Sequence, residues 1–76
     1  MQMPNERPFD LLNNSIGQLV LIRLKGNMSI RGRIVSFDAH MNVKIENAEE
    51  LEDGELKTKL GTILLRGGNI IFVAVV

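Results

Sequence analysis

The chain has 76 residues, a formal net charge of zero, no cysteine and one histidine. A domain this small buries only about 60% of the surface of its unfolded chain, the missing cysteines exclude disulfide bonds and thiolate metal sites, and one histidine with scattered carboxylates makes a poor metal site. No apolar run approaches the roughly 20 residues that span a bilayer and the N-terminal residues lack the apolar core of a signal peptide, so we expect one soluble, cytoplasmic domain without metal or cofactor.

A short helix is expected over residues 8–16. Pro8 suits a first helical position, Asp10 favours the positive end of the helix dipole, and the pattern stops at Gly17. The apolar residues at helical spacing are Phe9, Leu12 and Ile16. Fewer than about 12 residues do not hold a helix alone in water, so this helix should pack over an open end of the remaining structure.

Alternation of apolar and polar residues begins at Gln18 and is typical of β-strands. The expected strands cover residues 18–25, 28–38, 42–48, 55–66 and 69–76, and the turn pairs between them include Gly26-Asn27, Asp53-Gly54 and Gly67-Gly68. The interior glycines Gly32 and Gly61 indicate sharp bends, which let one strand serve both halves of a small barrel. We therefore predict a mostly β fold in which one helix precedes a strongly bent five-stranded barrel.

The same alternation assigns faces to the second and third strands. On one face of the second strand it places Ile30, Gly32, Ile34 and Ser36. On the other face it places Arg31, Arg33, Val35 and Phe37. In the third strand, Val43 and Ile45 should point inward.

The net charge of zero conceals a segregation of charge. Residues 46–55 contain six of the nine acidic residues and none of the nine basic residues, which leaves +6 on the rest of the chain. We interpret residues 49–55 as an acidic loop. A basic body suits a polyanionic ligand, although an acidic loop on an ordinary surface would produce the same composition.

The last strand is unusually apolar. Residues 70–76 contain no charge, no proline and no polar side chain, and such a strand aggregates if it is left at a sheet edge. Pairing with another copy would cover it and enlarge a small core. If each copy offers a different edge to its neighbour, the contacts run head to tail and can close into a ring, so we predict a cyclic homo-oligomer.

Catalysis is not indicated. Ser36, Asp38 and His40 look like a nucleophile, an acid and a base, but alternate residues of a strand lie about 6.6 Å apart, whereas a nucleophile and its base need contact at about 2.6–3.2 Å. The RGGN segment at residue 66 is also too short for a phosphate-binding loop and leads into a strand.

Single-stranded nucleic acid is the ligand that the polar residues suit better. His40 and Arg66 are planar groups at strand ends, and each can stack on a base, while an amide such as Asn42 can recognise a base edge with one donor and one acceptor. The alternatives are structural: Asn42 can serve an unusual turn, Gly67 and Gly68 can be turn residues, and Arg66 can be solvated.

Two longer motifs identify the family that the chain resembles. LIRLKGNMSIRGRIVSFDAHMNVKIENAEE, within residues 18–48 and slightly beyond, resembles the first motif of the Sm and Sm-like proteins, and LLRGGNIIFVAV, within residues 56–76, resembles the second. RPFDLLNNSIGQLV is similar to the N-terminal helix of archaeal members. The resemblance thus covers residues 1–76 as one Sm domain, a five-stranded antiparallel barrel capped by a helix.

The resemblance also implies a function. Family members form rings, most often heptamers in archaea, through pairing of the fourth strand with the fifth strand of the next subunit. Loops at the central pore bind uridine-rich single-stranded RNA, one nucleotide per subunit. Carried over by position, His40 and Arg66 would stack on uracil, Asn42 would bind its edge and Gly67 would give backbone access, with Asp38 orienting the loop. Met41 and Gly68 are further supporting residues.

The resemblance also shows one departure from the family pattern and implies a second RNA contact outside the pore. Gly68 stands where these proteins often have an aspartate that helps to orient the base-reading asparagine, so we expect uracil preference to survive with lower affinity. A second RNA contact is implied at Arg7 and Phe37, where a phenyl face can stack. The alternative function is a ring-shaped scaffold that binds proteins through its acidic segment. A hexameric ring similar to the bacterial Sm-like proteins is disfavoured, because the second motif of this chain contains Arg-Gly-Gly-Asn and not the Tyr-Lys-His type.

Overall fold

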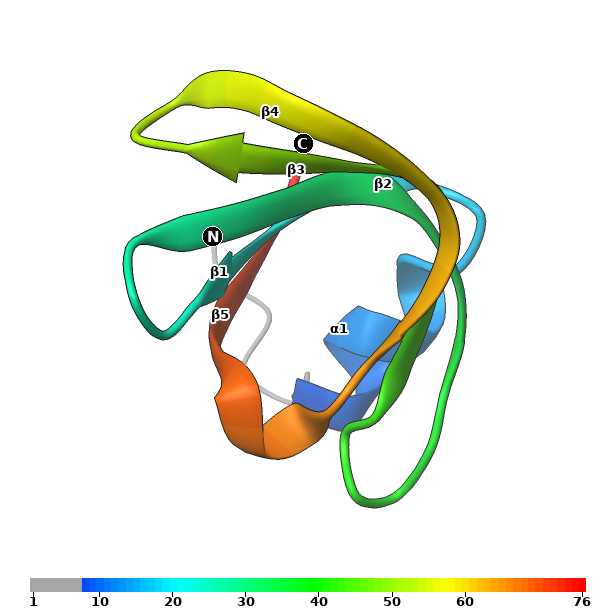
Figure 1. Ribbon diagram of the computed structural model, residues 1–76. Coiled ribbons are helices and arrows are strands. Elements are labelled where there is room, and N and C mark those ends of the chain that lie inside the picture. The colour runs from blue at the N-terminus through cyan, green and yellow to red at the C-terminus, as the bar shows by residue number, and fades with distance from the viewer. Residues whose placement is uncertain (1–7) are drawn as a thin grey trace, which may run out of the picture.

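The computed structural model describes residues 8–76 and shows one helix packed against a strongly curved sheet (Figure 1). The elements are α1 (Pro8–Asn14), β1 (Leu19–Leu24), β2 (Met28–Phe37), β3 (Val43–Glu52), β4 (Glu55–Leu65), the 3-10 turn η1 (Gly67–Asn69) and β5 (Ile70–Val75). The strands pair antiparallel in the order β4-β3-β2-β1-β5. The predicted mostly β, five-stranded fold is therefore confirmed. Within residues 8–76, no helix has the length and apolar character needed to cross a membrane.

The core lies inside the curve of the sheet. Its fully covered side chains come mainly from β1, β2 and β3, because alternate residues of these strands point to the same face. They are Val20, Ile22, Ile30, Ile34, Val43, Ile45 and Ala48. Gly32 permits the bend: a Cβ there would lie 3.0 Å from the Glu46 carbonyl oxygen and 3.1 Å from the Ala48 Cα. Only glycine lets β3 approach β2 this closely.

Helix α1 ends two residues earlier than the predicted range of 8–16. The chain turns at Ser15, whose backbone N–H and buried Oγ both donate to the Leu12 carbonyl oxygen, over 3.0 and 2.8 Å. Gly17 then adopts a φ of 87°, which stops helical continuation. Leu12 joins the core at 5% exposure, but Ile16 is 43% exposed, because the helix ends before it and this turn redirects it.

The predicted faces of β2 hold as far as Ile34 and fail beyond it. Ile30, Gly32 and Ile34 are buried, but Ser36 is exposed and Phe37 packs against the core. The register between β2 and β3 shifts between Ile34 and Ser36. Such an irregularity exchanges the faces of the residues that follow it. The prediction that Ser36 shares the face of Ile30 and Ile34 was therefore wrong, and Phe37 lies on that face instead.

Most of the predicted acidic loop, residues 49–55, is strand. β3 continues to Glu52 and β4 begins at Glu55, so the loop assignment was wrong except for a two-residue turn. Leu51 supports the extension, because it is only 7% exposed and adds a buried apolar residue to β3 within the acidic segment. Cross-strand ion pairs offset part of the negative charge: Arg31 with Glu49 at 2.7 Å and Lys57 with Glu52 at 3.2 Å.

The sheet ends at β4 on one side and β5 on the other. Each of these outer strands therefore has one edge without a strand partner among residues 8–76. Both strands expose large apolar side chains: Leu56, Leu60 and Leu64 on β4, and Ile71, Phe72 and Val75 on β5. The apolar last strand thus lies at a sheet edge, where the sequence predicts that another copy of the chain must cover it.

Candidate nucleic-acid interface

Two loops from distant parts of the sequence meet at one end of the sheet. The first, residues 38–42, follows β2, and the second, residues 66–69, precedes β5. They meet at Gly67, where a Cβ would lie 2.8 Å from the Met41 carbonyl oxygen and would also strike the carbonyl oxygen of His40. A side chain at residue 67 would therefore push the loops apart, so glycine is required here for close packing.

Asp38 organises the first loop. Its Oδ1 accepts hydrogen bonds from the backbone N–H groups of His40, at 2.9 Å, and Asn42, at 3.0 Å. The Met41 N–H donates to the Asp38 carbonyl oxygen over 3.0 Å, and Met41 adopts a φ of 64°. These bonds form a tight turn that an aspartate side chain favours, and they are the loop-orienting bonds expected of Asp38.

The side-chain amide of Asn42 is held at both ends. Its Nδ2 donates to Asp38 Oδ2 over 3.1 Å, and its Oδ1 accepts from the Gly67 N–H over 3.0 Å. A carboxylate can only accept and a backbone N–H can only donate, so these partners determine which end of the amide is nitrogen. One N–H and one lone pair of Asn42 stay available to a ligand. Both bonds form although residue 68 is a glycine and not the aspartate that often helps to orient this asparagine in the family.

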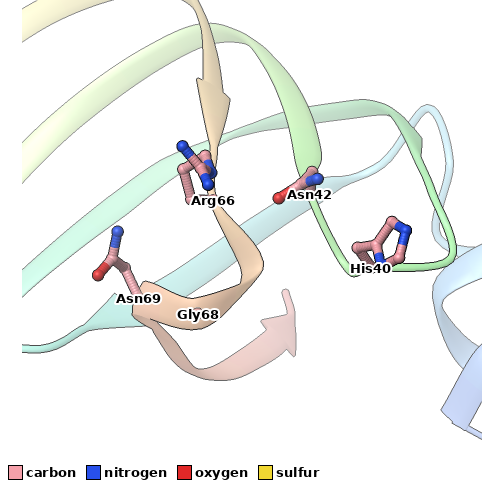
Figure 2. A pocket seen from close by; sticks show the side chains of 5 residues that line it. All are labelled: His40, Asn42, Arg66, Gly68 and Asn69. Carbon is pink, nitrogen blue, oxygen red and sulfur yellow. The ribbon is translucent and has the colours of Figure 1, made fainter.

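The amide faces an open hollow of about 710 Å³ (Figure 2). His40, Asn42, Arg66, Gly68 and Asn69 line it. The structure therefore brings together the two planar groups and the amide that the sequence selected. In Figure 2, Asn42 lies between Arg66 and His40, and the Arg66 and His40 side chains are both exposed.

The charges around the hollow suit an anionic ligand. Neither ion pair found within residues 8–76 involves Arg66, so its positive charge has no carboxylate partner there. Hydrogen bonds from the Asn42 side chain, the Asn42 backbone and the His40 backbone hold the pKa of Asp38 below its ordinary value. The Asp38 carboxylate beside the amide is thus already engaged by N–H donors.

Met41 and Gly67 contribute mainly to a neighbouring apolar groove. This groove lies beside helix α1 and strand β5, and its lining includes Leu11, Ile71 and Phe72. Met41 is exposed, and Gly67 is partly covered by the first loop. Gly68 borders the hollow, and apart from its chain neighbours no atom of residues 8–76 lies within 4 Å of the position that its Cβ would take. The lower affinity expected from its missing carboxylate stays a prediction.

Asn69 lines the hollow but was not among the site residues predicted from the sequence. It was assigned to the start of the last strand, whereas it belongs to η1 and lines the hollow. Its place directly after Arg66-Gly67-Gly68 was the available signal, because three residues of turn carry it to the same side as Arg66.

The implied second RNA contact is only partly within the described chain. Phe37 is half-buried and packs against the core. Arg7 lies outside the described residues. The pairing of these two residues therefore stays a prediction. Among residues 8–76, no three histidine or carboxylate side chains gather as a metal site would require.

Comparison with known sequences identifies relatives. The model of the LSM domain family matches residues 10–75. A protein described as snRNP Sm-like from Methanosarcina barkeri is 44% identical over 68 residues, which cover 90% of this chain and 94% of that protein. A protein of the same description from Pyrococcus furiosus is 41% identical over 69 residues, which cover 91% of each.

Solved structures give the same result for the fold. The Sm protein of Pyrococcus abyssi, determined in complex with a uridine heptamer, superposes with a TM-score of 0.91 at 37% identity, over 93% of this chain and all of that one. One chain of the P. aerophilum SmAP1 heptamer superposes with a TM-score of 0.85 at 42% identity, over 91% of this chain and 92% of that one. The sequence relatives and the structural relatives therefore indicate the same family.

Proposed function

This chain belongs to the LSM domain family, and from that premise we propose that it forms a ring that binds uridine-rich single-stranded RNA at its pore, with one nucleotide per subunit. The family relationship supports the class of protein. The choice of uracil depends on the residues of this chain. The observation that supports it is the orientation of the Asn42 side-chain amide.

The remaining hydrogen-bonding groups of Asn42 match uracil. The uracil edge offers O4 as an acceptor and N3–H as a donor, so O4 can accept from the free N–H of Nδ2 and N3–H can donate to the free lone pair of Oδ1. Cytosine presents the reverse pattern, an N4 donor and an N3 acceptor. Rotating the amide to suit cytosine would turn Nδ2 toward the Gly67 N–H and Oδ1 toward the Asp38 carboxylate, and both bonds would be lost.

His40 and Arg66 supply the contact to the base faces. Both are exposed at the hollow and carry planar groups, so a base can stack against either or both. A stacked base contributes about 1–3 kcal/mol. The charge of Arg66, which has no carboxylate partner among residues 8–76, also favours a nearby phosphate. Gly67 and Asp38 act on the base indirectly, by positioning Asn42.

Ring assembly multiplies this weak site. The open edges of β4 and β5 both expose apolar side chains, so head-to-tail pairing between copies would cover them. SmAP1 of P. aerophilum forms a heptamer, and we assign the same number of subunits to this chain. Linked sites raise the effective concentration of each further nucleotide, so avidity replaces tight single contacts.

We assign this chain a binding role in RNA processing or metabolism and no catalytic step. The side chains of the hollow include no serine, threonine or cysteine nucleophile, and the Asp38 carboxylate is engaged by N–H donors. We propose that this chain acts as a single Sm domain in the cytoplasm.

Fluorescence anisotropy tests the proposal. Labelled ten-nucleotide oligo(U) and oligo(C) are titrated in parallel with the wild-type protein and with Asn42→Ala at near-physiological salt. We expect the wild type to prefer oligo(U) and Asn42→Ala to lose that preference. Equal, salt-sensitive binding of both oligonucleotides would contradict base recognition. Binding of neither would favour the protein scaffold, with the acidic β3–β4 hairpin as its docking surface.

A further inference from the structure

Asn69 occupies a fixed position in the hollow. Its backbone N–H donates to the Arg66 carbonyl oxygen over 3.0 Å, and its own carbonyl oxygen accepts from the Lys25 N–H over 3.2 Å. These two bonds hold the residue between η1 and the turn after β1. Its side chain is exposed and lines the same hollow as Arg66.

The Asn69 amide is available to a ligand. Among the described residues, its side chain makes no hydrogen bond, in contrast to the amide of Asn42, which makes two. The adjacent Gly68 adds no side chain, and apart from its chain neighbours no atom of the described residues lies within 4 Å of where one would begin. A ligand on Arg66 can therefore approach Asn69 without displacing protein atoms.

The position of Asn69 relative to Arg66 indicates which part of a nucleotide it meets. In Figure 2, Asn69 extends on one side of Arg66, while Asn42 and His40 lie on the other side. A base that stacks on Arg66 with its edge toward Asn42 directs its glycosidic bond away from Asn42. The sugar then lies on the side of Asn69.

We propose that Asn69 hydrogen-bonds the ribose 2′-hydroxyl of the nucleotide bound at Arg66, and thereby makes the site selective for RNA over DNA. The inference rests on the proposed function. A 2′-hydroxyl both donates and accepts a hydrogen bond, and an amide can satisfy either role. The 2′-hydroxyl is also the group by which a protein distinguishes RNA from DNA at a given site.

The test compares oligo(U) with oligo(dU), which differ only in the 2′-hydroxyl. Anisotropy titrations are made with the wild type, Asn69→Ala and the control Asn13→Ala, an exposed asparagine on helix α1. We expect the wild type to prefer oligo(U). Asn69→Ala should reduce the ratio of the affinity for oligo(U) to that for oligo(dU) by about fivefold or more, because each subunit loses one hydrogen bond to a 2′-hydroxyl. Asn13→Ala should leave both affinities unchanged. Sedimentation and thermal melting verify that each variant keeps the assembly of the wild type.

The possible results separate this inference from the proposal on which it rests. If the wild type binds oligo(U) and Asn69→Ala weakens both oligonucleotides equally, Asn69 contacts base or phosphate and the inference is overturned. An unchanged ratio with unchanged affinities also overturns it, while base recognition by Asn42 survives. Failure of the wild type to bind oligo(U) overturns both.

Discussion

The Gly67 backbone N–H donates a 3.0 Å hydrogen bond to Oδ1 of Asn42, across 25 residues of sequence. This bond joins the loop after β2 to the turn before β5. It also sets the direction of the Asn42 amide, because Oδ1 must face the N–H donor and Nδ2 then faces Asp38. The contact between the two loops thus determines where the amide can donate and where it can accept a hydrogen bond.

Gly67→Ala should separate the loops. The new methyl group would lie 2.8 Å from the Met41 carbonyl oxygen, so we expect the free energy of unfolding to fall by about 1–3 kcal/mol. Thermal and denaturant unfolding measure this change. Gly68→Ala is the matched control, because its added Cβ meets no described atom within 4 Å beyond those of its chain neighbours. Equal stability of the two variants would argue against tight packing of the loops at Gly67.

Asp38 should stay ionised to lower pH than an unperturbed aspartate. Its pKa is lowered in the folded state, so its contribution to loop stability is fully present above the unfolded-state pKa of about 3.9 and is lost as pH falls through the folded-state pKa. In two-dimensional NMR, we expect the amide resonances of His40 and Asn42 to titrate with a midpoint below about 3.9. Asp38→Asn should abolish that titration. A midpoint at or above the ordinary value would contradict the bonding described.

His40→Ala and Arg66→Ala should each weaken oligo(U) binding by about tenfold or more, because each removes a stacking surface worth about 1–3 kcal/mol per base. Anisotropy titration measures the affinity, and sedimentation checks the assembly. Lys44→Ala is the control for lost charge, since Lys44 is exposed on β3 and does not line the hollow. If the stacking variants lose their assembly instead, His40 and Arg66 have structural roles.

The open sheet edges should control the oligomeric state. Leu64 on β4 and Ile71 on β5 are 64% and 58% exposed, and a charge buried between copies would be strongly unfavourable. We therefore expect Leu64→Glu and Ile71→Glu to convert the ring to monomers in sedimentation velocity.

Leu19→Glu is the control for the edge variants. Leu19 is 41% exposed but lies on β1, which pairs with β2 on one side and β5 on the other. We expect this variant to stay assembled. Intact rings in both edge variants would show that β4 and β5 are not the contacts between subunits.

The sequence by itself determined the number of strands and their order along the chain. Alternation of apolar residues is a local property, so it is the same in any arrangement of the sheet. Buried Ile30 and Ile34 match it directly. The sequence also selected His40, Asn42 and Arg66, since the chemistry of planar groups and amides does not depend on the fold. Family resemblance supplied their expected joint role.

Only the tertiary structure decided the register and the meeting of the loops. The shift between Ile34 and Ser36 depends on how β2 pairs with β3, and it turns Phe37 toward the core against the simple alternation. Asn69 reaches the hollow through the turn that follows Arg66, and the Asn42 amide is oriented by a residue 25 positions away. These features arise from contacts between distant segments, which a periodic pattern along one segment does not encode.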